Sequence, residues 1–330
     1  MNQRNLLTDD RPQPEALAPV NLLDERFNQP IQLDHHFSLL RKLNKNGETR
    51  RYGLTILFGD GDAANEIKYE LAVTYLGLTP ENTLRYKLER TSPVYINELI
   101  PELVADQLAY EVGKVFYPLT IETSKDGKFL AIQNLEEIRK RWPAVRAAVT
   151  AYFEGDFTTR YLQLMDEKLA DDGAIQICLR DDWFIQVYFQ AIYKSYTESL
   201  SIQTQLNFPN LEPMTAGYHT IERLNERTNH FGAIELEHYG MFKPTENQQS
   251  IGEYQAKYIL SPVSKAIQII IASWRWKERK DRDINLKLFT LDEEDNDTLA
   301  RGSLGVAIEN LIILDGNETR EGNRFWDKWF

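Results

Sequence analysis

Apolar and polar residues alternate in the first third of the chain, which is the pattern of strands with one buried face. Three such stretches, 52–58, 67–75 and 84–88, follow one another. The connections between them, 59–62 and 77–82, are short. Because short loops join antiparallel neighbours, this pattern predicts an antiparallel meander with one face towards solvent.

The best-defined stretch is 118–142. An alternating run ends at a turn containing Asp126 and Gly127, residue types that tolerate positive φ, and a second short apolar run follows. Asn134 then stands at an N-cap position with Glu137 three residues later, as in a capping box. The sequence predicts a hairpin and then a helix beginning at Leu135, with Trp142 buried.

Apolar residues recur every three or four positions from 135 to 192, which predicts a helical middle. The spacing continues through Pro143, which removes a backbone donor, so we expect a kink or two abutting helices there. Further helices are predicted over 157–170 and 183–192, whereas 174–180 fits neither helix nor strand clearly. Pro101 marks the start of an earlier helix that runs to about residue 116.

The last third of the chain returns to strict alternation. The run 200–208 places Ile202, Thr204 and Leu206 on one face, with glutamine and asparagine on the other. Similar patterns predict strands at 233–241, 253–260, 266–276, 284–290 and 304–314. No internal repeat of fixed period is evident.

These elements predict an α+β fold in which two antiparallel β-rich portions flank a helical middle segment. The first 33 residues hold four of the thirteen prolines and few apolar residues, so we expect an extended arm. The expected division is a proline-rich arm (1–33), an N-terminal β-rich portion with one helix and the central hairpin (34–133), a helical middle (134–197), a C-terminal antiparallel β portion (198–323) and an aromatic C-terminal segment (324–330).

Composition is that of a globular protein, with 42% hydrophobic and 27% charged residues among 330. The formal net charge of -12 repels nucleic-acid phosphates and anionic membrane surfaces. We therefore expect no nucleic-acid partner.

The single cysteine, Cys178, excludes an intramolecular disulfide and a cysteine-rich zinc site, and it suits a reducing compartment. The first 30 residues lack the apolar region of a secretory signal. The longest aliphatic run, 269–272, is too short to cross a bilayer. These features predict a cytoplasmic location and no membrane insertion.

Glu235 and Glu237 are the candidate catalytic residues. On a strand they share one face, while the neighbouring His238 points to the other face. Two carboxylates at this spacing could serve as the acid and base of a glycoside hydrolase. Alternating glutamates on a solvent-facing strand are much commoner, and we favour that interpretation.

No metal site or cofactor is predicted. His35 and His36 are adjacent and cannot both face one side of a strand or helix. The acidic turns around Asp60 and at 292–297 lack the glycine and distal glutamate of a calcium-binding EF-hand loop.

Trp274 and Trp276 share one face of a predicted strand. Paired aromatic rings can form a stacking platform for a sugar or a base. The same face is apolar further back along the strand, which favours packing in the core instead.

The chain ends in an aromatic segment, RFWDKWF. On a helix its four aromatic side chains form one ridge that must be covered, either by the protein's own sheet or by a neighbouring subunit. Both possibilities stay open for Phe325, Trp326, Trp329 and Phe330.

The leading functional hypothesis is a non-enzymatic cytoplasmic protein that acts through protein–protein contacts, as a subunit or adaptor of a larger assembly or by self-association. One alternative is a hydrolase of a carbohydrate or other neutral polar substrate, which requires Glu235, Glu237, Trp274 and Trp276 to line one cleft. Another alternative is a β-barrel-like carrier of an apolar ligand.

Overall fold

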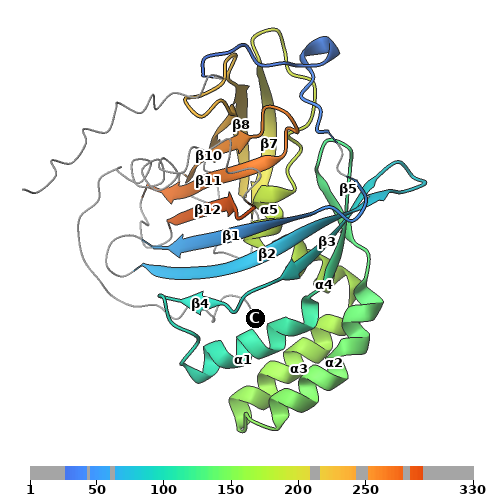
Figure 1. Cartoon of the computed structure of the whole chain (residues 1–330). Coiled ribbons are helices and arrows are strands. Elements are labelled where there is room, and N and C mark those ends of the chain that lie inside the picture. Colours follow the sequence, from blue (N-terminus) through green and yellow to red (C-terminus); the bar gives the residue numbers. More distant parts are fainter. Residues whose placement is uncertain are drawn as a thin grey trace, which may run out of the picture.

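All the strands that the structure describes belong to one antiparallel sheet (Figure 1). The computed structural model describes residues 27–42, 45–59, 64–208, 216–242, 252–277 and 283–292. Within these residues the sheet has 12 strands in the order β6-β5-β3-β2-β1-β12-β11-β10-β9-β8-β7, and β4 pairs with β2 off this path. The protein is thus mostly β, with helices between two groups of strands.

The two groups of strands come from opposite ends of the chain. The first group is β1 (Thr49–Phe58), β2 (Asn65–Leu78), β3 (Leu84–Arg90), β4 (Tyr95–Ile96), β5 (Leu119–Thr123) and β6 (Phe129–Ile132). The second is β7 (Ser201–Phe208), β8 (Ala216–Leu224), β9 (Ile234–Phe242), β10 (Gly252–Leu260), β11 (Ile267–Trp276) and β12 (Ile284–Thr290). They meet where β1 pairs with β12, so the two β-rich portions expected from the sequence are joined in one sheet.

The α-helices lie between these groups in the chain, apart from α1. Their bounds are α1 (Val104–Gly113), α2 (Leu135–Thr150), α3 (Asp156–Ala170), α4 (Asp172–Arg180) and α5 (Trp183–Tyr188), with short 3-10 helices at His35–Phe37 and Lys114–Phe116. Figure 1 shows α1, α2 and α3 gathered at one end of the molecule and α5 against the sheet. No helix of the described residues is both long and apolar enough to cross a membrane.

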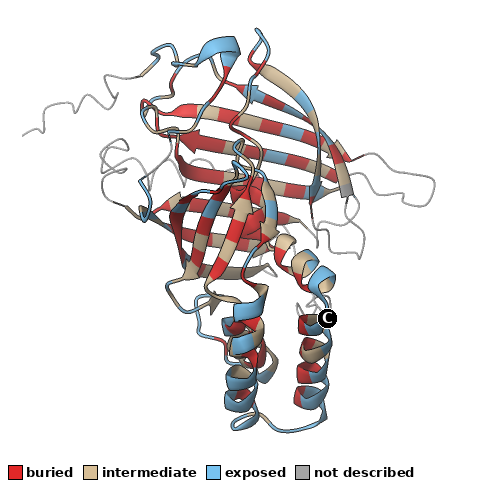
Figure 2. Ribbon diagram, turned by 90° about the vertical axis from the view of Figure 1, so that its right-hand side faces the viewer, coloured by how far each residue is buried: buried red, intermediate tan, exposed pale blue. Residues whose placement is uncertain are grey.

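The core forms between the inner face of the sheet and α5, five of whose six residues are buried. The Tyr188 ring lies 5.2 Å from that of Tyr52 on β1, and the two hydroxyl groups are 3.2 Å apart. The Tyr258 hydroxyl donates a hydrogen bond of 2.9 Å to the Val187 carbonyl. Buried and exposed residues alternate along the strands in Figure 2, as the sequence pattern predicts.

The predicted hairpin is present as β5 and β6, but Asn134 does not act as a capping side chain. It makes no cap hydrogen bond to α2. Its Oδ1 instead accepts from the Thr120 N–H at 2.8 Å, and its Nδ2 donates to the Pro118 carbonyl at 2.9 Å. The prediction of a capping box is therefore wrong. The Asn134 side chain instead connects the first hairpin strand to the start of the helix through these two hydrogen bonds.

Helix α2 runs unbroken through Pro143, where we expected a kink or two helices. Pro143 is exposed, so water can satisfy the carbonyl that loses its partner. Trp142 is buried as predicted, with 7% of its surface exposed, and its Nε1 donates to Asp166 Oδ1 at 2.6 Å.

The sequence pattern did not predict strand β8 or helix α4. Strand β8 carries Thr220 and Glu222 on its buried face, which breaks the apolar alternation. Helix α4 occupies the ambiguous stretch, and its start is fixed by Asp171 Oδ1, which accepts from Gly173 N at 2.8 Å.

Candidate functional site

Trp274 belongs to the core. It is 1% exposed, and its ring centre lies 4.8 Å from that of Trp183 and 5.2 Å from that of Phe208. Trp276, two residues further on, is half-buried. A ring packed on both sides in this way has no face left for a sugar or a base.

Glu235 and Glu237 lie on the other face of the sheet from Trp274. On strand β10, Tyr254 pairs with Gly240 on one side and with Trp274 on the other, so Gly240 and Trp274 are oriented towards the same face of the sheet. Both glutamates lie an odd number of positions from Gly240 on β9. Because side chains alternate along a strand, they point to the opposite face. Lys257 Nζ lies 3.6 Å from Glu235 Oε2 and 3.2 Å from Glu237 Oε1. The four side chains required by the hydrolase alternative do not share a cleft.

Glu235 also has a structural role besides its ion pair with Lys257. Its two carboxylate oxygens accept from the Asn225 and Asn229 side chains at 2.9 and 3.0 Å. It thus fixes the loop between β8 and β9.

The aromatic residues Phe325, Trp326, Trp329 and Phe330 lie outside the described residues, as do the first 26 residues of the predicted arm. The partner-binding role expected of the aromatic segment stays a prediction. Within the described ranges no group of three or more His, Cys, Asp or Glu side chains could hold a metal ion.

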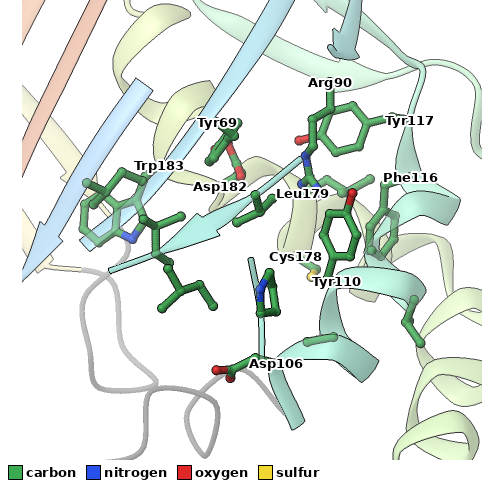
Figure 3. Close-up of a pocket in the computed structure, with 18 of the residues that line it drawn as sticks. Tyr69, Arg90, Asp106, Tyr110, Phe116, Tyr117, Cys178, Leu179, Asp182 and Trp183 are labelled. Atoms are coloured by element: carbon green, nitrogen blue, oxygen red, sulfur yellow. The ribbon is translucent and has the colours of Figure 1, made fainter. Parts of the chain in front are cut away.

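A cavity of about 210 Å³ lies between the first strands of the sheet and the helices (Figure 3). Strands β1 to β4 contribute one wall, α1 and the 116–117 segment a second, and α3, α4 and the start of α5 the third. Most lining side chains are apolar, among them Ile56, Phe58, Ile67, Met165 and Leu179. We call this cavity the Arg90 pocket.

Arg90 stands out because it occupies an inward-facing position. It continues the row of Leu84, Tyr86 and Leu88, which are all buried. Among the residues that the structure describes around this pocket, it is the one lysine or arginine. Arg90 is not among the candidate residues expected from the sequence, although an arginine that extends a buried apolar row is a signal that could have indicated it.

Two tyrosine rings hold the guanidinium of Arg90. Its central carbon lies 4.6 Å from the centre of the Tyr117 ring and 5.3 Å from that of Tyr69. Burial lowers the pKa of Arg90, but the neighbouring Tyr117 and Tyr69 hydroxyls and the Asp182 carboxyl outweigh that effect and raise it overall. Arg90 therefore stays charged while it is stacked in a cation–π arrangement.

The Nε atom of Arg90 is buried and has no hydrogen-bond partner among the described residues. A buried donor without an acceptor lowers the stability of the folded state, and few buried donors in native proteins lack an acceptor. Figure 3 shows Arg90, Tyr110, Tyr117 and Asp182 around the same part of the pocket. Protein atoms cover Nε itself, whereas the Arg90 side chain as a whole lines the pocket.

Asp182 and Cys178 are two further ionisable residues that line this pocket. Asp182 caps α5, since its Oδ1 accepts from Ile185 N at 3.1 Å, and burial raises the pKa of its carboxyl. Burial also raises the pKa of the Cys178 thiol. Because the thiolate is the reactive form, Cys178 is a poor nucleophile. The pocket is better suited to binding than to covalent chemistry.

A second polar group is buried on the inner face of β8 and β9. Glu222, 2% exposed, accepts from Lys194 Nζ at 2.9 Å and from Thr204 Oγ1 at 2.8 Å. His238 Nε2 lies 3.8 Å from Glu222 Oε2, and its Nδ1 is 3.2 Å from the Tyr254 hydroxyl. Burial, and then Lys194, lower the pKa of His238 to about 3, so its ring is neutral at physiological pH.

Comparisons with known proteins find no counterpart: no protein-family model matches the chain, and neither does any curated protein sequence. The fold and the Arg90 pocket are therefore the basis of the functional argument.

Proposed function

We propose that this protein binds a small, mostly apolar molecule that presents one hydrogen-bond acceptor to Arg90. The observation that carries the proposal is the charged Arg90 side chain, the one lysine or arginine among the described residues that line this largely apolar pocket. Ligand sites typically combine an apolar lining with a few polar groups that fix orientation. This is a binding function of the kind expected for a carrier or a sensor.

The size of the pocket limits the ligand. An apolar cavity of about 150 Å³ is large enough to bind benzene. At about 210 Å³, the Arg90 pocket suits a molecule with one ring and a short substituent. The acceptor on that substituent would reach Arg90, while Tyr69 and Tyr117 hold the guanidinium in place.

Acetophenone and ethylbenzene form a matched pair of probes, since they differ mainly by one carbonyl oxygen. A hydrogen bond to a charged group contributes about 1.5 to 3 kcal/mol, so we expect acetophenone to gain about tenfold or more in affinity from Arg90. In Arg90→Leu this advantage over ethylbenzene should disappear. Arg85→Leu, on the outward face of the same strand, is the control and should preserve it.

Methionine methyl groups report where the probes bind. Met165 lines the pocket, whereas Met241 lies on β9, outside the lining. In protein with 13C-labelled methionine methyl groups, titration should shift the Met165 resonance and leave that of Met241 unchanged. Equal affinity for both probes in the wild type, or shifts that spare Met165, would show that the pocket does not act in this way.

A further inference from the structure

The two edges of the sheet are not alike. Edge strand β6 is four residues long, and other parts of the chain cover it. The Ile132 N–H donates to Gln176 Oε1 at 2.9 Å, and Gln176 Nε2 donates back to the Ile132 carbonyl at 2.7 Å. The Phe129 N–H donates to the Phe189 carbonyl at 3.0 Å. The backbone of this edge is therefore largely satisfied within the molecule.

Strand β7 is the other edge of the sheet, and none of the described segments pairs with its outer side. It pairs with β8 over all eight residues without a bulge. Beyond that ladder, the backbone hydrogen bonds of this strand within the described residues are those of Ser201 with the Thr197 side chain. Its sequence, SIQTQLNF, contains no charged residue and no proline, two common means by which proteins block an edge.

The strand is also chemically symmetric about Thr204. Reading outward in both directions gives an amide on each side, then an aliphatic side chain, then a small polar one. These matched pairs are Gln203 with Gln205, Ile202 with Leu206, and Ser201 with Asn207. In an antiparallel pair of identical strands, residues at equal distances before and after the centre face each other.

We propose that β7 is a self-association strand, and that two copies of the chain pair antiparallel through it about a twofold axis at Thr204. Amides would then face amides and aliphatic side chains would face aliphatic ones, with no like charges opposed. Ile202 and Leu206 are half-buried on the inner face, and Leu206 borders an open depression of about 410 Å³ that a partner strand would help to cover. The product is one sheet continuous across both copies.

The register can be tested by disulfide trapping in a Cys178→Ser background, which removes the native thiol. Copies carrying Gln203→Cys are mixed with copies carrying Gln205→Cys and mildly oxidised. The proposed register places the two thiols directly opposite, so the mixture should give roughly tenfold more cross-linked dimer than either variant alone, whose thiols are diagonal. Equal yields in all three samples would overturn the proposed register.

The interface itself is tested with charge. Gln203→Lys combined with Gln205→Lys opposes like charges across the twofold axis, and both side chains are exposed, so the fold should be unaffected. In size-exclusion light scattering over a dilution series, wild type should be dimeric and the double variant monomeric. His219→Lys, on the same face of β8 one strand further in and also exposed, is the control and should remain dimeric.

Three results would contradict the proposal. The first is a wild-type protein that is monomeric throughout the dilution series. The second is a double variant that stays dimeric. The third is a monomeric double variant in which the β7 amides that do not bond to β8 nevertheless resist hydrogen exchange, because the chain's own residues would then cover this edge.

Discussion

His238 shows how a buried polar side chain couples the stability of this fold to pH. Its ring is surrounded by Glu222, Lys194, Tyr254 and Tyr258, and burial lowers its pKa to about 3 from an ordinary value of 6.5. His238 therefore becomes protonated near pH 6.5 in the unfolded chain but only near pH 3 in the folded protein. The stabilising effect of the neutral ring is complete above pH 6.5 and is lost as the pH falls through this window.

We expect His238→Gln, which does not titrate, to remove this dependence. Relative to the variant, wild type should lose up to about 1.4 kcal/mol of unfolding free energy per pH unit of acidification between about pH 6 and pH 4. Urea unfolding of both proteins across that range measures the difference. The neighbouring Glu222, Lys194 and tyrosines are present in both, so a parallel pH dependence would show that His238 does not titrate in this way.

At the scale of single elements, Asn134 joins the hairpin to helix α2. Its side chain satisfies the Thr120 N–H and the Pro118 carbonyl, and it is buried. Removing one partner from a buried hydrogen bond leaves the other group without a replacement. Asn134 thus connects β5 to the start of α2, and Arg141 further along α2 also donates to the Pro118 carbonyl.

Asn134→Ala should destabilise the fold by about 1 to 3 kcal/mol, because the Thr120 N–H loses its acceptor and the Pro118 carbonyl keeps only the donor from Arg141. Chemical denaturation followed by circular dichroism gives the change. Gln133→Ala, at the exposed neighbouring position, is the control and should stay within about 0.5 kcal/mol of wild type. If both variants lost the same stability, the Asn134 contacts would not matter.

The elements also show what the amino-acid pattern can predict. Regular alternation located β1, β2, β7 and β9 to β12, because each places apolar side chains on one face. It failed at β8, whose inner face holds the polar residues Thr220 and Glu222. Glu222 accepts hydrogen bonds from Thr204 and Lys194, which are distant in the sequence. A buried polar side chain is recognisable as such only when its partner is known.

The Arg90 pocket could not be predicted for the same reason. Its donor, its aromatic neighbours and its apolar lining come from separate elements spread from β1 to α5. The sequence does place Arg90 at the end of a buried row, but nothing local indicates that Tyr69 and Tyr117 enclose it. The pairing of β1 with β12 is likewise invisible to a local pattern, since more than 220 positions separate the two strands.

For the whole molecule, β12 is the strand that unites the fold. It is the last described strand in the chain, yet it lies at the centre of the sheet, between β1 and β11. The Arg90 pocket lies on the first group of strands and the β7 edge at the far end of the second. Ligand binding and self-association are therefore separate proposals, and either can fail without the other.

The central claim is that the Arg90 pocket binds a small apolar molecule through an acceptor held at Arg90. A crystal structure of the protein soaked with acetophenone tests it most directly. We expect the ring between Ile67, Met165 and Leu179, with the carbonyl oxygen about 2.7 to 3.2 Å from a nitrogen of the Arg90 guanidinium. An empty pocket at saturating probe, or a carbonyl turned away from Arg90, would contradict it.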